Sequence, residues 1–397
     1  MGEVVRYAFR LRPGTLAERA LSAEWDRCRF LWNEAVHQQK SGGRPTFGSL
    51  SKMLTEARAR CGWLREGSHM AQQQMLRTYG KALHQSFTVK GRGRPKFKAR
   101  KSALLSLEFT ARGFRIHNGR LVLPKGVSVP VVWSRELPSE PSSVRVIRDS
   151  LGHWYASFVV RRDSEPVREA VGGIGVDWGV ATTATTTDSR FDLPSLGHRK
   201  RCAAELAKAQ RSMARRHSGK RGPQSKGYER AKRKASRLQK KAARQTRHDS
   251  RVWAKRVVDG HNLIAVEDFT PIFLAKSTMA RKAADAAIGA AKRELVERGV
   301  RAGRRVVLVR PAYTSMTCSR CFARAKQRLG LDERVFRCGS CGHTEGRDRN
   351  AAGVVLAVAE RGHTRVDDVR QSDHLPRGVG VACGLSVKSP AFRLGKR

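Results

Sequence analysis

Hydrophobic and polar residues alternate near the N-terminus, where Val5, Tyr7, Phe9 and Leu11 are separated mostly by arginines. An alternation with a period of two predicts one β-strand, which the Pro-Gly pair at 13–14 would end. From residue 15 to about residue 87, apolar residues recur at steps of three and four, which predicts helices. Short apolar runs separated by Gly, Pro and Ser then predict strands at 104–109, 121–123, 127–133, 144–147 and 154–160. This order indicates a β-module interrupted early by a helical insertion.

A second pattern begins at residue 173, where two apolar runs flank a tight turn and predict a pair of strands up to residue 187. Residues 261–267 have the continuous apolar pattern of a buried strand. A helix over 278–299, a strand over 306–309 and a final helix that includes 351–358 follow. The chain is therefore predicted to be a multidomain protein of the α+β / α/β class. The segment after about residue 362 is rich in Gly, Arg, Pro and Ser, and we expect it to be disordered.

Charge changes this picture more than any other property of the 397-residue chain. There are 80 Lys and Arg against 34 Asp and Glu, a formal net charge of +46. Residues 199–256 alone hold 22 Lys and Arg and three acids, on two predicted helices separated by residues 219–227. A folded domain keeps this much like charge only beside a polyanion, so nucleic acid is the expected partner.

A membrane is not an expected partner. No segment approaches the roughly 20 consecutive apolar residues that a membrane span needs, and the N-terminus lacks the pattern of a signal peptide. Four of the eight cysteines are scattered without a pattern, which favours a reducing compartment over a disulfide framework. We expect a cytoplasmic protein.

Four cysteines near the C-terminus have the spacing of a metal site. Cys318 and Cys321 form one C-x₂-C pair, and Cys338 and Cys341 form a second pair, with 16 residues between the two pairs. Two such pairs at this separation can close one tetrahedral shell of four thiolates around Zn²⁺. A closed shell leaves no open position, so we expect a structural zinc ion. His343 is an alternative ligand, but a surface histidine is the better interpretation while four thiolates are available.

Three carboxylates are candidates for catalysis. Asp177 lies on the first strand of the second pattern, Glu267 ends a later strand, and Asp348 precedes the final helix. Acids at strand ends and at a helix start can converge on a pair of Mg²⁺ or Mn²⁺ ions, as phosphodiester hydrolysis requires. Each residue also has an ordinary interpretation, because an acid at a strand end is often a turn residue and Asp348 can cap its helix.

These motifs, taken in order, resemble a known family. They are Gly175-Val-Asp177-Trp-Gly179, Val266-Glu267-Asp268-Phe269, the two C-x₂-C knuckles and Arg347-Asp348-Arg-Asn350-Ala-Ala352. Their order and spacing resemble the TnpB (OrfB zinc-ribbon) family of transposon-encoded RNA-guided nucleases and its relatives, the miniature type V CRISPR effectors. Three further segments, Arg29-Phe-Leu-Trp-Asn33, Gly93-Arg-Pro95-Lys-Phe97-Lys98 and Gly152-His-Trp-Tyr155-Ala-Ser157, are similar to the family's helical recognition segment, its basic loop and the strand before its nuclease domain. The resemblance covers about residues 4–360.

The resemblance implies a domain order. A β-barrel-like, oligonucleotide-binding module (1–14 and 90–165) would carry a helical insertion (15–89) and grip a guide RNA and a short DNA motif beside the target. An RNase H-like (RuvC) nuclease domain would occupy 172–312 with basic helices at 199–256, followed by a zinc ribbon at 313–345, the last RuvC helix at 346–362 and the tail at 363–397. Asp177, Glu267 and Asp348 would bind two Mg²⁺ or Mn²⁺ ions and hydrolyse target DNA to a 5′-phosphate and a 3′-hydroxyl, while base pairing with the guide selects the target.

Two positions depart from the family pattern. Gly346 stands where family members usually carry an aspartate, two residues before the last catalytic one, and we expect activity to survive because Asp348 itself is present. Phe322 follows the first knuckle where glycine is usual, which we expect to reshape the knuckle without removing a ligand.

Basic residues in two segments are the candidates for nucleic-acid contact. They are Lys90, Arg92, Arg94, Lys96, Lys98, Arg100 and Lys101 in the loop, and Arg230, Lys234, Arg237 and Lys241 in the second basic helix. A run of charge is often only a solvated face, but the density of this one indicates phosphate contacts.

Three alternatives stay open. A transposon-encoded nuclease and a CRISPR effector would look nearly alike at this length. A guided DNA binder or repressor that cleaves weakly or not at all would characteristically have lost acids of the triad, and all three are present here. A guide-free transposase or resolvase on the same fold is disfavoured by the basic helices and the recognition-like N-terminal half.

Overall fold

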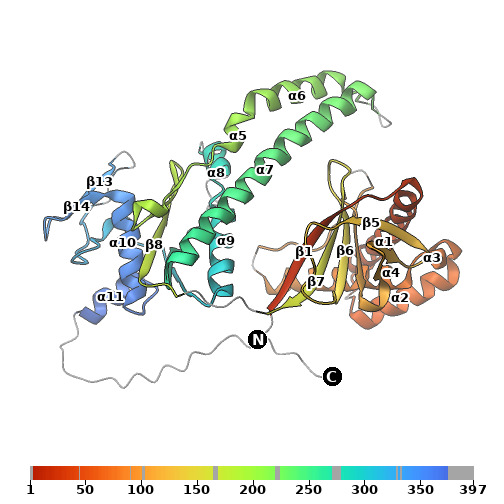
Figure 1. The fold of residues 1–397 in the computed structure, drawn as a ribbon, viewed down its shortest axis with the longest axis horizontal. Coiled ribbons are helices and arrows are strands. Elements are labelled where there is room, and N and C mark those ends of the chain that lie inside the picture. The colour runs from red at the N-terminus through yellow and green to blue at the C-terminus, as the bar shows by residue number, and fades with distance from the viewer. Residues whose placement is uncertain are drawn as a thin grey trace. The chain divides into compact units, whose positions relative to one another are not determined.

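The computed structural model describes residues 3–43, 45–89, 91–100, 103–163, 169–219, 224–270, 279–327, 330 and 333–373 (Figure 1). The chain divides into two compact units. The first comprises Met1–Pro166 and Cys202–Lys241, and the second comprises Val167–Arg201 and Ala242–Arg397. In the described part of the chain, no helix is long and apolar enough to cross a membrane.

Seven strands form the sheet of the first unit, in the order β2-β6-β7-β1-β5-β4-β3 with antiparallel pairing. They are β1 (Glu3–Leu11), β2 (Ser106–Thr110), β3 (Arg115–His117), β4 (Arg120–Leu123), β5 (Val127–Val132), β6 (Ser143–Arg148) and β7 (Trp154–Arg162). Strand β1 pairs with β7 along its whole length and with the end of β5, so the N-terminal strand lies inside a sheet built mainly from later residues. The interrupted β-module is confirmed, and β3 is a strand that the sequence pattern did not predict.

Four helices lie between β1 and β2 in the chain and form the helical insertion. They are α1 (Thr15–Lys40), α2 (Phe47–Arg60), α3 (Gly62–Glu66) and α4 (His69–Thr88). Thr46 caps α2 in a reciprocal capping box with Ser49, and the Ser68 side chain accepts a hydrogen bond from the backbone at the start of α4. The apolar faces of these helices join the sheet in one hydrophobic core.

The basic helices are α5 (His198–Arg201), α6 (Ala203–Arg216) and α7 (Lys226–Gly260). The sequence assigned all of residues 199–256 to the second domain, whereas residues 202–241 belong to the first compact unit. One physical reason is an ion pair, 2.6 Å long, between Lys240 on α7 and the half-buried Asp149, which follows β6. The remainder of α7 belongs to the second unit, where Trp253 and Val257 enter its core.

The sheet of the second unit has the order β10-β9-β8-β11-β12. The strands are β8 (Gly173–Trp178), β9 (Thr182–Thr186), β10 (Leu193–Pro194), β11 (Leu263–Glu267) and β12 (Arg305–Val309). Strands β8, β11 and β12 run parallel, while β9 is antiparallel to β8 and to β10. This mixed sheet is the RNase H-like arrangement that the family resemblance implied.

Helices cover both faces of this sheet, with α10 on one side of β8 and α7 and α9 on the other (Figure 1). They include α8 (Ala280–Ala286), α9 (Ile288–Arg301), α10 (Arg347–Glu360) and α11 (Val366–Asp373). Side chains alternate along the strands, so Ile174, Val176, Ile264 and Val266 pack with α7 and α9, whereas Ala265 packs with α10. A left-handed residue, Ala287, separates α8 from α9 where the sequence predicted one helix.

The tail predicted to be disordered from residue 363 begins with helix α11. That prediction is wrong for Val366–Asp373, because Val366 and Val369 are buried in the core beside α10. The prediction rested on the average composition of the segment, in which two apolar residues among polar neighbours have little weight. Residues 374–397 lie outside the described part of the chain.

Helix α10 approaches strand β8 so closely that only glycine fits between them. A Cβ atom on Gly175 would overlap the carbonyl oxygen of Ala352, a backbone atom in the middle of α10 that cannot move without the helix. Asp177 lies two residues beyond Gly175 on the same face of β8, and Asp348 lies one helical turn before Ala352. The absence of a side chain at Gly175 therefore sets the distance between these two acids.

We expect Gly175→Ala to lower the free energy of unfolding of the second unit by about 1–3 kcal/mol, the usual cost of overpacking. Chemical unfolding followed by circular dichroism measures the effect. Gly289→Ala is the control in the same unit, because its new Cβ would meet only the flexible end of Arg293, at 3.6 Å. Equal stability of the two variants would contradict the role assigned to the contact.

Candidate functional site: a four-cysteine centre and an acidic cluster

The four predicted cysteines come together. The Sγ atoms of Cys318 and Cys341 are 3.7 Å apart, those of Cys321 and Cys338 are 3.5 Å apart, and all four lie within 4.8 Å of one another. A tetrahedral Zn²⁺ with bonds of about 2.3 Å places its sulfur atoms about 3.8 Å apart. The donor set and its spacing therefore fit a zinc ribbon.

Backbone N–H groups of the second knuckle favour ionised sulfur. Burial of the Cys338 thiol opposes ionisation, but the N–H groups of Cys341 and Ser340 and the neighbouring thiols lower its pKa to about 6. Burial raises the pKa of Cys318 and that of Cys321, the latter to about 12, so a bound cation would be needed to hold all four sulfur atoms as thiolates. His343 is not part of the cluster, since its Nε2 lies 3.4 Å from Ser319 Oγ and 3.3 Å from a carboxylate oxygen of Glu345.

The two knuckles have matching backbones despite the unusual Phe322. Phe322 and Gly342, each the residue after a knuckle, have left-handed φ angles of 57° and 70°. In each knuckle this residue donates its N–H to the carbonyl of the first cysteine, over 3.1 Å. The phenylalanine bears the strain of this conformation, while its ring is 5% exposed and packs against residues of α10. The knuckle is therefore not reshaped, and Phe322 joins it to the core.

The three candidate acids lie on the same face of the second sheet. The register pairs Val266 of β11 with Val176 of β8, which places the next residues, Glu267 and Asp177, side by side at the carboxyl ends of parallel strands. The two carboxyl groups are close enough for each to shift the pKa of the other. Asp348 lies in the first turn of α10, which covers this face, and makes no capping hydrogen bond, so the interpretation as a simple helix cap is not supported.

Raised pKa values distinguish Asp177 and Glu267 from surface carboxylates. Burial, the charges of Glu267 and Asp348, and the hydrogen bond to Glu267 hold the pKa of Asp177 well above its ordinary value. Burial also raises the pKa of Glu267, which is 6% exposed, although the Thr314 hydroxyl, Asp177 and the Lys292 ammonium oppose this. Burial and the neighbouring carboxylates disfavour the charged form of Asp177, so a cation between the acids would stabilise it. Over the described residues, only the four cysteines form a ligand group closed within 4.8 Å, so the acids are a looser cluster.

Several residues that hold the acids in place were missed by sequence reasoning. Trp178 donates its indole N–H to the Glu267 carbonyl, and Thr314 donates its hydroxyl to the Glu267 carboxylate. Lys292 on α9 donates to the Asp268 carboxylate at 2.5 Å. Arg349 binds Thr186 and Asp192 beside β9. Of these residues, only Trp178 lies inside one of the acidic motifs' strand positions, directly after Asp177.

The basic loop is held along helix α1, which changes the role of Lys98. The Trp32 indole donates to the Lys96 carbonyl, and Asn33 bonds both the N–H and the carbonyl of Lys98. The Lys98 ammonium lies 4.0 Å from the ring centre of Trp32 and 5.2 Å from that of Trp25. Burial lowers the pKa of Lys98. These surroundings do not support phosphate contact by Lys98, which instead fastens the loop.

The other predicted contact residues are more accessible. Arg92, Arg94, Lys96 and Arg100 are exposed, with Arg94 over the Phe87 ring and Arg100 paired with Asp26 at 3.6 Å. Lys90 and Lys101 lie outside the described residues. On α7, the exposed residues Arg230, Lys234, Arg237 and Lys241 are spaced by four, three and four positions, so they share one helix face.

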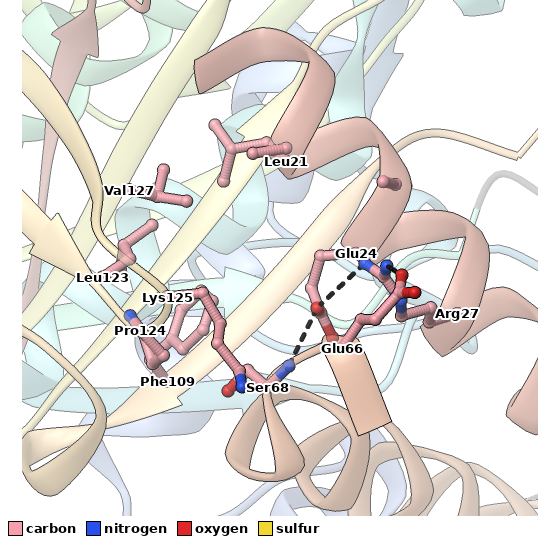
Figure 2. Close-up of a pocket in the computed structure, with 12 residues that line it drawn as sticks. Leu21, Glu24, Arg27, Glu66, Ser68, Phe109, Leu123, Pro124, Lys125 and Val127 are labelled. Carbon is pink, nitrogen blue, oxygen red and sulfur yellow. Dashed lines mark hydrogen bonds and ion pairs between the residues drawn. The ribbon is translucent and has the colours of Figure 1, made fainter. Parts of the chain in front are cut away.

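A cavity of about 220 Å³ lies in the first unit between α1 and the turn from β4 to β5 (Figure 2). The polar residues at one end of the cavity are bonded to one another. Glu24 accepts the Ser68 N–H at 2.9 Å and pairs with Arg27 at 3.7 Å, while Arg27 binds Glu66 at 2.9 Å. None of the three candidate acids lines it. We interpret the cavity as a feature of the fold of the first unit.

The cysteine centre predicts a specific loss on mutation. Cys341→Ser should abolish zinc binding and destabilise the second unit, because binding energy in such ribbons is folding energy. Metal analysis by mass spectrometry and thermal unfolding measure the two effects. Cys61→Ser, a cysteine outside the cluster, should keep the zinc content of the wild type. Normal zinc content in Cys341→Ser would refute the site.

Lys98→Met should lower the stability of the first unit by about 0.5–2 kcal/mol, because the cation between two indole rings is lost. Lys96→Met is the comparison, since the Lys96 side chain is exposed and only its backbone is bonded to Trp32. Thermal unfolding should separate the two variants, and nucleic-acid binding should weaken in Lys96→Met. If Lys98→Met unfolds like the wild type, the fastening role is wrong.

Comparisons with known proteins agree with this geometry. Residues 157–271 match the family model described as a probable transposase, and residues 291–355 match the Cas12f1-like TNB domain. A Streptomyces pristinaespiralis protein named putative RNA-guided DNA endonuclease is 29% identical over 385 residues, 93% of each chain. The Escherichia coli (strain K12) putative RNA-guided DNA endonuclease InsQ is 27% identical over 384 residues, 90% of this chain and 93% of its own.

Among solved structures, that of the Cas12f1-sgRNA-target DNA complex aligns with a TM-score of 0.56. The alignment covers 88% of this chain and 98% of that chain at 13% sequence identity, so it shows a shared fold. The two domain matches, the curated relatives over nearly the whole chain and this common fold all support the resemblance to the TnpB-like family.

Proposed function

We propose that this protein is an RNA-guided DNA endonuclease whose RuvC-type site hydrolyses target DNA with two divalent cations, Mg²⁺ or Mn²⁺. Asp177, Glu267 and Asp348 would hold these ions. The observation that carries the proposal is the convergence of the three carboxylates, from two strand ends and a helix start, on the face of the sheet under α10. The relatives named as putative RNA-guided DNA endonucleases support the same activity.

The chemistry follows from the charge of the site. Bound divalent ions would activate a water molecule and neutralise the charge that develops on the phosphate. The three carboxylates supply hard oxygen ligands, and cations between them would relieve their mutual repulsion. Thr314 and Trp178 hold Glu267 through its carboxylate and its carbonyl, so its position is fixed from both ends. Cleavage is favoured over a purely DNA-binding role because none of the three acids is missing.

Nucleic-acid binding would fall to the basic surfaces. The stripe formed by Arg230, Lys234, Arg237 and Lys241 presents four cations along about 16 Å of helix, a surface suited to a phosphate backbone. The structural neighbour was solved with guide RNA and target DNA, which supports the same partners here. The protein would act in the cytoplasm, associated with the nucleoid.

The four-cysteine centre has a separate role in this proposal. Zn²⁺ would be bound by thiolates alone, so it would hold the ribbon together without reaching the DNA phosphate. The ribbon connects to α10 at its start, through β13 (Val335–Arg337) and β14 (Thr344–Gly346). The two metal types would therefore serve structure and catalysis separately.

Asp177→Ala, Glu267→Ala and Asp348→Ala should each reduce DNA cleavage by more than about 100-fold, since even the partners of metal ligands contribute 10- to 100-fold. The measurement is cleavage of a DNA target complementary to the RNA that co-purifies with the protein. RNA and DNA binding should persist in all three variants, because the basic surfaces are unchanged.

Asp259→Ala is the control for this series, because Asp259 is an acid of the same unit whose partner is Lys255 on the surface of α7. It should cut like the wild type. A triad variant that retains the wild-type rate would remove that residue from the metal site, and retention by all three would refute the proposed function.

A further inference from the structure

The carboxylate of Glu267 is held by a residue at the entrance to the zinc ribbon. Thr314 Oγ1 lies 2.9 Å from Glu267 Oε1 and 3.1 Å from the Pro311 carbonyl oxygen. Thr314 is 2% exposed and Glu267 is 6% exposed, so water does not compete freely for either group. A hydroxyl has one proton to donate, and an ionised carboxylate is a stronger acceptor than a carbonyl. Thr314 therefore donates to Glu267 when that residue is ionised.

The first zinc knuckle determines where Thr314 lies. Tyr313, the preceding residue, has a left-handed φ of 69°, a conformation unfavourable for a residue with a side chain. It is held there by the Thr317 hydroxyl, which donates to its carbonyl at 2.9 Å, and by the Arg324 guanidinium, 3.7 Å from the centre of its ring. Thr317 adjoins Cys318, and Arg324 follows Cys321 by three residues. The turn that presents Thr314 is thus built from knuckle residues.

The same knuckle is attached to helix α10 by Asn350. The fully buried Asn350 side chain donates to the Thr317 carbonyl at 2.8 Å and accepts the Ser319 N–H at 2.9 Å. Asp348 lies two residues earlier, about 200° around the helix, so the two side chains point to different sides of α10. A side chain on Gly353 would also meet Ser319 Cβ at 2.8 Å, so knuckle and helix are in close contact.

We propose that Thr314 is a positioning residue for the divalent-cation site, and that the first zinc knuckle, through Thr314 and Asn350, fixes Glu267 and Asp348 relative to each other. The inference rests on the proposed function and deepens it. A hydroxyl bonded to one carboxylate oxygen restricts rotation of that carboxylate. Partners of this kind typically change the affinity of a metal site 10- to 100-fold. Zinc binding and divalent-cation binding are then coupled through named hydrogen bonds.

A purely local role for Thr314 makes a different prediction. The residue begins the short 3₁₀ turn Thr314–Met316, and its hydroxyl can satisfy itself on the Pro311 carbonyl. In that case removal of the hydroxyl would change stability but not the affinity for divalent cations. Cation affinity at constant stability and zinc content therefore distinguishes the two roles.

The test compares Thr314→Val, which keeps the shape and removes the hydroxyl, with Thr314→Ser, which keeps the hydroxyl. Mn²⁺ is titrated into the zinc-loaded, full-length protein after removal of nucleic acid, and free Mn²⁺ is followed by electron paramagnetic resonance. Glu267→Gln gives the background of Mn²⁺ bound elsewhere. We expect Thr314→Val to raise the Kd by about 10-fold or more and Thr314→Ser to stay within about threefold of the wild type. The Mg²⁺ concentration for half-maximal cleavage should shift in parallel, with little change at saturation.

Thr344→Val is the matched control, because it also removes a threonine hydroxyl from the ribbon. That hydroxyl is exposed and donates to the Gly342 carbonyl, not to Glu267. This variant should leave the Mn²⁺ Kd unchanged. Wild-type affinity in Thr314→Val would overturn the inference, as would an equal loss in the valine and serine variants. Thr314→Ala replaces the valine variant if valine prevents folding. If the wild type binds no more Mn²⁺ than Glu267→Gln does, the cation site of the proposed function fails as well.

Discussion

The backbone contact between Gly175 and Ala352 is the constraint on which the rest of the second unit depends. Every other residue type at position 175 carries a Cβ, and a Cβ would push α10 away from β8. Asp177 follows Gly175 by two residues on the strand, and Asp348 precedes Ala352 by four residues on the helix. The acidic cluster therefore exists because a helix and a strand touch through their backbones, and the apolar residues Val354, Val355 and Val358 keep the helix in place.

Helix α10 also joins two kinds of chemistry. Its first turn carries Asp348. The helix contacts the first zinc knuckle through the hydrogen bonds of Asn350 and through packing against Phe322 of the knuckle. In the proposed function, a thiolate centre would stabilise a small ribbon that has few apolar residues of its own, and the carboxylates would hold divalent cations. A soft, closed site and a hard, open site could coexist at one helix because their ligands would select different metals.

The sequence predicted the elements that depend on short-range pattern, including β1, the strand ending in Glu267 and the two cysteine knuckles. It failed where long-range packing decides. Lys98 looked like any other base in its loop until Trp25 and Trp32 were found around its ammonium group. Thr314 and α11 were missed because a single hydroxyl and two valines in a polar segment carry no periodic signal. The acids were predicted individually, whereas the register of β8 and β11 places Asp177 beside Glu267 and α10 carries Asp348.

The central claim is that a bound RNA selects the DNA that the acidic cluster cuts. The most direct measurement is to sequence the RNA that co-purifies with the protein and to test cleavage of DNA complementary to it, before and after the RNA is stripped. The account predicts one discrete RNA, cleavage of the matching DNA in the presence of Mg²⁺, and loss of cleavage on stripping. A heterogeneous RNA population together with cleavage that persists without RNA would contradict it.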